Sequence, residues 1–295
     1  MHDFDYQKVV SLKEAIEAIS NSKGSSILMA GGTDLLIKLK EEMIRPARVI
    51  DLKGIHDIDG LAISENELSV GALTTMRVLE TSPTVLAKAP LLAQAAAKLG
   101  SVQVRYRATI GGNLCNAAPS AETAPALLAL DAKAEIYGKS GTRIVDLCDF
   151  FSGPGATTLG EGEILTSLKI PLNGNQQGAV YYKLSARKAM DIAFVGVAVL
   201  LEVETNGLIK KARIALGAVA PTPLRVLSAE KILEGKPFDA AAVEESARLA
   251  VQACQPISDI RASAEYRREM VGQLCRRGLF AAYHQAASVK EGEII

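Results

Sequence analysis

The sequence contains no tryptophan, four cysteines and three histidines, and it has no excess of charge of either sign. Aromatic residues make up 4% of the chain, and 33 basic side chains balance 33 acidic ones. Without a basic excess, the chain lacks the electrostatic signature of proteins that bind nucleic acid or anionic membranes. Residues 1–5 are acidic, and no apolar run is long enough to cross a membrane. We therefore expect a cytoplasmic protein that is not inserted into a membrane.

The four cysteines, Cys115, Cys148, Cys254 and Cys275, are widely scattered and form no C-x-x-C pair. A disulfide framework is not expected in an otherwise intracellular sequence of this length. The spacing also argues against an iron–sulfur or zinc site built by this chain alone. We expect all four to be small, buried or half-buried side chains.

The sequence also lacks the common motifs of catalysis and nucleotide binding. It has no G-x-S-x-G, no G-x-x-x-x-G-K-[ST] and no G-x-G-x-x-G, which argues against a common hydrolase, a P-loop and a Rossmann site. His2, His56 and His284 stand apart from cysteines and are expected at the surface. We therefore assign no catalytic residue and no metal ligand to this chain.

Two glycine-containing stretches stand out. The first glycine loop, residues 30–35, follows an apolar run and contains Gly31 and Gly32. The second glycine loop, residues 107–113, contains Gly111 and Gly112 and precedes an apolar run, 123–130, with helical spacing. Glycines expose backbone N–H groups, and a helix N-terminus adds positive potential, so such a loop suits a phosphate. One Gly-Gly turn is weak evidence for a ligand site. Two such turns, each predicted as strand–glycine–helix, indicate two loops that bind one dinucleotide.

The hydrophobic pattern predicts an α+β protein of two domains. Strands at 26–30 and 48–52 around a helix at 35–42 indicate a small parallel unit. Two hairpins, at 61–72 and 133–146, indicate antiparallel pairing. We expect a first domain at 1–172, with subdomains of about 1–54 and 55–172.

The pattern changes after the polar segment 173–178, which we interpret as a linker. Three antiparallel strands are predicted at 180–184, 195–204 and 208–218. Three helices are then predicted at 228–233, 240–254 and 263–283. This second α+β domain spans 179–284.

Residues 30–36 (AGGTDLL) and 109–113 (TIGGN) resemble the two FAD pyrophosphate loops of the FAD-binding subunits of molybdenum hydroxylases. That family includes the flavin domain of xanthine dehydrogenase and the medium subunit of aerobic carbon monoxide dehydrogenase. The runs 100–107, 163–165 and 182–187 are similar to the family as well, so the resemblance extends over nearly the whole chain. It implies an FAD-binding domain of the vanillyl-alcohol-oxidase/PCMH type, followed by a CO-dehydrogenase-flavoprotein-like domain with a three-stranded antiparallel sheet and helices.

The resemblance also implies which residues hold the cofactor. Those implied at the pyrophosphate are Leu28, Met29, Ala30, Gly31, Gly32, Thr33, Asp34, Leu35, Thr109, Ile110, Gly111, Gly112 and Asn113. Those implied nearer the flavin are Leu99, Leu165 at the isoalloxazine edge, Glu122, where many relatives have aspartate, and Lys183. A cation at Lys183 would stabilise the charge of the reduced flavin. The first glycine loop lacks the histidine that covalent relatives use, which implies non-covalent FAD.

By resemblance, the chain is an oxidoreductase subunit of a larger molybdenum hydroxylase complex. Partner subunits would carry two-iron two-sulfur clusters and molybdopterin, and FAD would pass electrons to an external acceptor. NAD is the favoured acceptor, with a quinone, ferredoxin or oxygen left open. Two alternatives stand beside this interpretation: a free-standing flavin oxidoreductase of the same fold, and a non-catalytic assembly module whose glycine loops are only turns.

Overall fold

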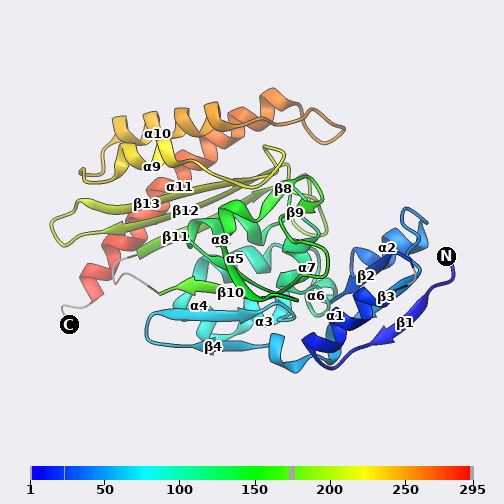
Figure 1. Ribbon diagram of the computed structural model, residues 1–295. Coiled ribbons are helices and arrows are strands. Elements are labelled where there is room, and N and C mark those ends of the chain that lie inside the picture. Colours follow the sequence, from blue (N-terminus) through cyan, green and yellow to red (C-terminus); the bar gives the residue numbers. More distant parts are fainter. Residues whose placement is uncertain (1, 23, 173–176, 293–295) are drawn as a thin grey trace.

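The structure is a computed structural model that describes residues 2–22, 24–172 and 177–292. The first four residues of the predicted linker, 173–176, lie outside the described residues, and its last two, 177 and 178, are not linker but begin strand β11 (Gln177–Leu184). Three larger sheets follow one another along the chain, and helices pack around the second and third (Figure 1). This arrangement confirms the predicted α+β class. The domain boundaries themselves stay a prediction.

The first sheet is parallel, with strand order β1-β3-β2, and lies at the N-terminal end of the molecule (Figure 1). Its elements are β1 (Asp5–Lys8), α1 (Leu12–Ser20), β2 (Ser26–Met29), α2 (Leu35–Lys40) and β3 (Arg48–Asp51). Ser11 Oγ accepts the N–H of Glu14 at 3.2 Å, and the Glu14 carboxylate accepts the N–H of Val10 at 2.8 Å, which fixes the first turn of α1. The predicted strand–helix–strand unit is confirmed, and β1 is an additional strand.

The second sheet is antiparallel, with order β4-β5-β10-β6-β7. Its strands are β4 (Leu61–Ile63), β5 (Glu67–Gly71), β6 (Lys133–Gly138), β7 (Gly141–Asp146) and β10 (Ile164–Pro171). Both predicted hairpins, β4–β5 and β6–β7, are confirmed. The helices between β5 and β6 are α3 (Met76–Thr81), α4 (Pro83–Lys88), α5 (Pro90–Ala97), α6 (Val102–Arg105), α7 (Ile110–Cys115) and α8 (Thr123–Ala129). Of these, α4, α6 and α7 were not predicted.

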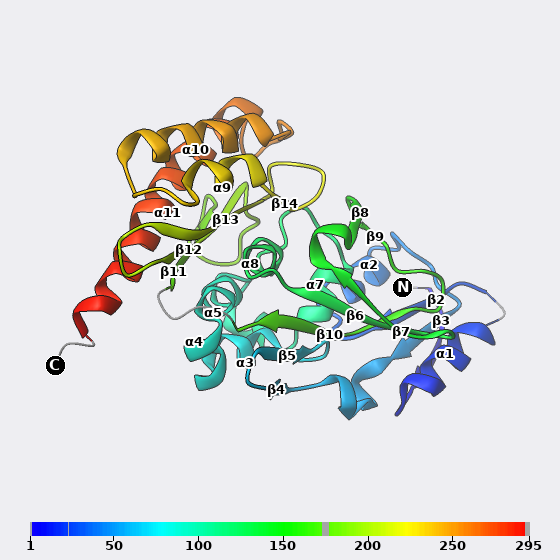
Figure 2. The ribbon, with the colours of Figure 1, turned by 60° about the vertical axis from the view of Figure 1, so that its left-hand side comes forward.

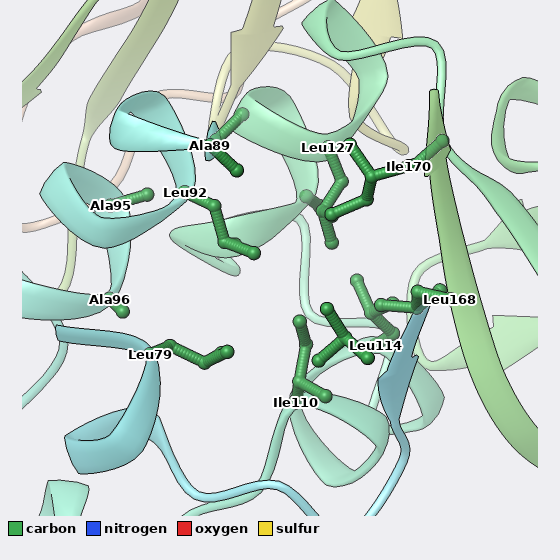
Figure 3. Packing of buried hydrophobic residues seen from close by; sticks show 14 of the residues in the cluster. Leu79, Ala89, Leu92, Ala95, Ala96, Ile110, Leu114, Leu127, Leu168 and Ile170 are labelled. Atoms are coloured by element: carbon green, nitrogen blue, oxygen red, sulfur yellow. The ribbon is translucent and has the colours of Figure 1, made fainter. Parts of the chain in front are cut away.

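The main hydrophobic core fills the space between these helices and the central strand β10. Figure 3 shows Leu92 from α5, Ile110 and Leu114 from α7, and Leu127 from α8 pointing toward Leu168 on β10. All five side chains are almost completely buried. The second glycine loop therefore begins a helix that is anchored in the core.

The third sheet has order β11-β12-β13-β14 and is antiparallel. Its elements are β11 (Gln177–Leu184), β12 (Val195–Val203), β13 (Ile209–Gly217), β14 (Leu224–Arg225), α9 (Leu227–Leu233), α10 (Ala240–Ala253) and α11 (Ala264–Gly292). The predicted three-strand meander is present, and the two-residue strand β14 extends it to four. Every residue of β12 is buried because helices α9 to α11 cover one face and α5 and α8 the other (Figures 1 and 2).

An ion-pair network joins the turn after α8 to the third sheet. Asp131 contacts Lys211 Nζ at 2.6 Å, Arg225 at 2.6 Å and Arg213 at 3.1 Å. Burial opposes ionisation of Asp131, yet the hydrogen bonds and charges of these three cations hold its pKa below the usual value. The network therefore fastens the glycine-loop half of the chain to the third sheet.

The remaining short elements connect the sheets. They are η1 (Leu52–Gly54), η2 (His56–Ile58), η3 (Leu147–Asp149), β8 (Phe151–Gly153) and β9 (Ala156–Thr157). No helix in the described part of the chain combines the length and apolar character needed to cross a bilayer.

Replacing Gly178 by alanine tests the packing of α11 on the third sheet. A Cβ at this position would lie 1.8 Å from the carbonyl oxygen of Ala282, so helix and strand would have to separate. We expect Gly178→Ala to lower the free energy of unfolding by about 3 kcal/mol, measured by urea denaturation. Gly153→Ala is the matched control, because no atom lies within 4 Å of its added Cβ. Equal stability of the two variants would contradict this packing.

Candidate functional site

The first glycine loop presents a run of unsatisfied backbone donors. It leaves β2 at Ala30, turns at Gly32 with φ +77°, and enters α2 at Leu35. Within the described structure, none of the N–H groups from Gly31 to Leu35 donates a hydrogen bond. Asp34 occupies the N-cap position of α2 but its side chain does not cap the helix. Consecutive free N–H groups at such a turn form a concave site for an anion.

The second glycine loop is built differently from its prediction. It follows helix α6 rather than a strand, and its glycines lie inside the first turn of α7. Thr109 caps this helix, and its Oγ1 accepts the N–H of Gly112 at 3.1 Å. The N–H groups of Ile110, Gly111 and Asn113 are bonded to backbone carbonyl groups. The predicted supply of free N–H groups is therefore wrong for this loop.

The glycines of both loops permit close packing. A Cβ on Gly111 would lie 2.7 Å from the carbonyl oxygen of Ala72, and a Cβ on Gly31 would lie 2.0 Å from that of Arg107. Gly31 belongs to the first loop and Arg107 to the second, so the two loops touch backbone to backbone. Lys38 Nζ donates to Asn116 Oδ1 at 2.7 Å and joins α2 to the end of α7.

Side chains connect the second loop to the third sheet. Thr123 donates its hydroxyl to Asn113 Oδ1 at 2.6 Å, which places the start of α8 beside the loop. The next residue back, Glu122, accepts from Lys183 Nζ of β11 at 2.8 Å. Both side chains of this ion pair are largely buried, with 12% exposure for Glu122 and 6% for Lys183. The structure thus brings Asn113, Glu122 and Lys183 together.

Burial and neighbouring charges have opposing effects on the pKa of the Glu122 carboxyl. Burial raises its pKa above the usual value, and the nearby charge of Asp34 adds to the rise, whereas Lys183 opposes it. The charge of Asp34 in the first glycine loop thus acts on this pair through space. The Glu122–Lys183 pair therefore joins the start of α8 to β11, within electrostatic range of that loop.

The predicted apolar residues occupy two environments. Leu28 and Met29, like the rest of β2, are half-buried, so this apolar strand is only partly covered. A hollow of about 600 Å³ opens beside Leu28. Leu99 and Leu165 are buried in the main core, where Leu165 pairs with Ile136 across the sheet. Contact of Leu99 or Leu165 with a cofactor stays a prediction.

Four supporting contacts had no clear signal in the sequence. Arg105 is buried, pairs with Glu80 at 2.8 Å and donates to the carbonyl oxygen of Leu99 at 2.9 Å. Lys183 Nζ also donates to the carbonyl oxygens of Lys98 at 3.0 Å and Asp191 at 2.6 Å. Backbone acceptors are available at every residue, so no residue type could mark them in advance.

The predicted environments of the cysteines are only half correct. Cys254 and Cys275 are buried, but Cys115 and Cys148 are exposed. Cys115 ends α7, whose core-facing side is already filled by Leu114. In the described residues, no three cysteine, histidine or carboxylate side chains gather as metal ligands would.

Comparison with known proteins identifies the family. Residues 2–173 match the family described as "FAD binding domain in molybdopterin dehydrogenase", and residues 180–282 match "CO dehydrogenase flavoprotein C-terminal domain". The chain belongs to the FAD-binding subunits of the molybdenum hydroxylases.

Individual relatives agree with this assignment. The chain is 34% identical to the carbon monoxide dehydrogenase medium chain of Hydrogenophaga pseudoflava, over 96% of this chain and 98% of that one. It is 33% identical to the putative xanthine dehydrogenase FAD-binding subunit XdhB of Escherichia coli K12, over 94% and 95% of the two chains. These relatives are dehydrogenase components, so the predicted class, an FAD-binding oxidoreductase subunit, is confirmed.

Solved structures show the same fold over 96% of the chain. Carbon monoxide dehydrogenase from Hydrogenophaga pseudoflava superposes with a TM-score of 0.92, over 96% of this chain and 98% of that one, at 34% identity. Quinoline 2-oxidoreductase from Pseudomonas putida 86 gives a TM-score of 0.90 at 31% identity, over 96% and 98% of the chains. The predicted FAD-binding fold is therefore confirmed.

The contact between the loops predicts a sharp difference between two glycines. Gly31→Ala would push its Cβ into the Arg107 carbonyl group, so we expect a loss of about 3 kcal/mol of stability and weaker FAD binding. Gly153→Ala is the matched comparison, because no atom lies within 4 Å of its added Cβ. Thermal unfolding and FAD titration measure both effects. A Gly31→Ala variant that matches wild type in both would show that the loops need not touch.

Proposed function

We propose that this chain is the electron-transfer subunit of a molybdenum hydroxylase complex and holds FAD without a covalent bond. The observation that carries the proposal is the run of free N–H groups from Gly31 to Leu35, set against a second loop and near a buried lysine. When bound, FAD can take up electrons and deliver two of them as a hydride. The chain itself supplies binding, orientation and charge.

The free N–H groups of the first loop would hold the pyrophosphate. The second loop would contribute through side chains, because its N–H groups are already bonded. Asn113 is the best donor there: Thr123 occupies its Oδ1, while its Nδ2 donates to no acceptor in the described structure. The proposed pyrophosphate residues are Leu28, Met29, Ala30, Gly31, Gly32, Thr33, Asp34, Leu35, Thr109, Ile110, Gly111, Gly112 and Asn113.

The flavin would lie near Leu99, Leu165, Glu122 and Lys183. Lys183 would supply positive potential in a place that is largely shielded from water, where a charge acts strongly. The Lys98 carbonyl group bonded to Lys183 precedes Leu99, so the cation and this apolar residue are adjacent. We assign no general acid or base to this chain.

The names of the relatives support the proposed partner subunits. A medium chain and an FAD-binding subunit imply further subunits, and the solved carbon monoxide dehydrogenase is described as lacking the Mo-pyranopterin moiety of its molybdenum cofactor, which implies a molybdenum site in that enzyme. We propose that one partner carries molybdopterin, that another carries two-iron two-sulfur clusters, and that the clusters deliver electrons to this chain. NAD is the proposed final acceptor.

The visible spectrum of the chain, co-purified with partners encoded beside its gene, tests this function. We expect iron–sulfur absorbance from the complex and FAD in the supernatant after acid precipitation. The isolated chain with FAD should oxidise NADH with a dye as acceptor, yet fail to hydroxylate a substrate. Gly153→Ala should retain FAD, because its added Cβ meets no atom.

Each contrary outcome points to a different error. FAD that stays in the protein pellet would contradict non-covalent binding, and the absence of FAD would favour the assembly module. Hydroxylation by the isolated chain would contradict the division of chemistry among subunits. Turnover of a substrate by the isolated flavoprotein, with no partner, would favour the free-standing oxidoreductase. Reduction of a quinone, ferredoxin or oxygen in place of NAD would correct the acceptor alone.

A further inference from the structure

The Lys183 ammonium group is fully occupied by acceptors within the protein. It has three N–H groups, and it donates to Glu122 Oε1 at 2.8 Å, the Lys98 carbonyl at 3.0 Å and the Asp191 carbonyl at 2.6 Å. These acceptors come from the start of α8, the end of α5 and the β11–β12 connection (residues 185–194). The ammonium group is therefore fixed in position by three separate segments.

Among the three acceptors, only Glu122 contributes a charge. A carboxylate 2.8 Å from an ammonium group cancels much of the potential that the cation projects to its surroundings. The other groups that face this pair are Asp34 from the first glycine loop, Tyr181 from β11 and the carboxylate of Asp191, which is paired with Arg187. Because Arg187 pairs with Asp191 and the buried Tyr181 phenol stays neutral, Glu122 is the charged group in direct contact with Lys183.

We propose that Glu122 is a positioning residue: it holds the Lys183 ammonium group in place and limits the positive potential that Lys183 exerts on the flavin. This inference rests on the proposed function, because it requires FAD beside Lys183. Reduction adds negative charge to the flavin, so a cation favours the reduced form and a paired carboxylate opposes that effect. The Glu122 side chain reaches the ammonium group directly, at 2.8 Å.

The midpoint potential of FAD in the full-length chain tests this role. Glu122→Gln keeps an oxygen that can accept from Lys183 but removes the charge, so we expect a higher potential. At a fixed solution potential, the ratio of reduced to oxidised flavin should be about tenfold higher in Glu122→Gln than in wild type. This is the order expected for loss of one charge at a partly shielded site. Lys183→Met should lower the potential. In the double variant, the Glu122→Gln change should have little further effect, because without Lys183 the buried Glu122 carboxyl is protonated and has no charge left to remove.

The pH profile gives a second readout. Burial raises the pKa of Glu122, so its protonation on acidification should move the wild-type potential toward that of Glu122→Gln. The Glu122→Gln variant should lack this part of the pH dependence. Glu122→Asp keeps the charge, so its potential should stay nearer to wild type than that of Glu122→Gln.

A matched control separates this role from simple destabilisation. Glu230 is also buried and paired, with Arg225 at 2.6 Å, but it lies in α9 on the far side of the third sheet. Glu230→Gln should therefore lower stability without moving the flavin potential.

The outcomes distinguish this inference from the proposed function. A wild-type chain that binds no FAD overturns both. Bound FAD with the same potential and pH profile in wild type and Glu122→Gln overturns this inference alone. Equal shifts from Glu122→Gln with and without Lys183 would show that Glu122 acts on the flavin directly, which also overturns it.

Discussion

The site depends on one close approach, that of the Gly31 backbone to the carbonyl group of Arg107. Because Gly31 has no Cβ, the turn after β2 rests directly on the turn before α7. This contact sets the free N–H groups of the first loop against a helix that the main core holds rigidly. The loops therefore form one surface, although about 75 residues separate them in the sequence.

The two glycine loops have similar sequences, but their backbone N–H groups differ in hydrogen bonding. In the first loop the backbone N–H groups are free to bind an anion. In the second loop the N–H groups already donate hydrogen bonds that hold the first turn of α7 in place. The side chains of Thr109 and Asn113 are available to the cofactor instead, and they project from the N-terminal end of α7, a helix packed into the main core. A mobile donor would lose conformational entropy on binding, so donors fixed in advance give tighter binding.

The third sheet contributes Lys183 to the proposed site. Lys183 lies on β11, and its ion pair with Glu122 crosses to the start of α8. The Asp131 network secures the opposite end of α8 to the same sheet. With both ends of this helix fastened, the lysine keeps a constant position relative to the glycine loops.

The sequence alone predicted the elements that carry a strong local pattern. The first loop, the two hairpins and the long strands β12 and β13 fall in this group, because alternation and glycine turns specify them directly. The short helices α6 and α7 were missed, since helices of four to six residues form only with tertiary support. The partners of Lys183 could not be predicted either, because two of them are backbone carbonyl groups.

The central claim concerns which backbone N–H groups receive the cofactor, and residue-resolved amide hydrogen exchange measures it directly. In the full-length chain without FAD, the amides of Gly31 to Leu35 should exchange fast and those of Ile110 to Asn113 slowly. Addition of FAD should slow exchange from Gly31 to Leu35 and change the second group little. Protection that appears only at Ile110 to Asn113, with Gly31 to Leu35 unchanged, would contradict the account.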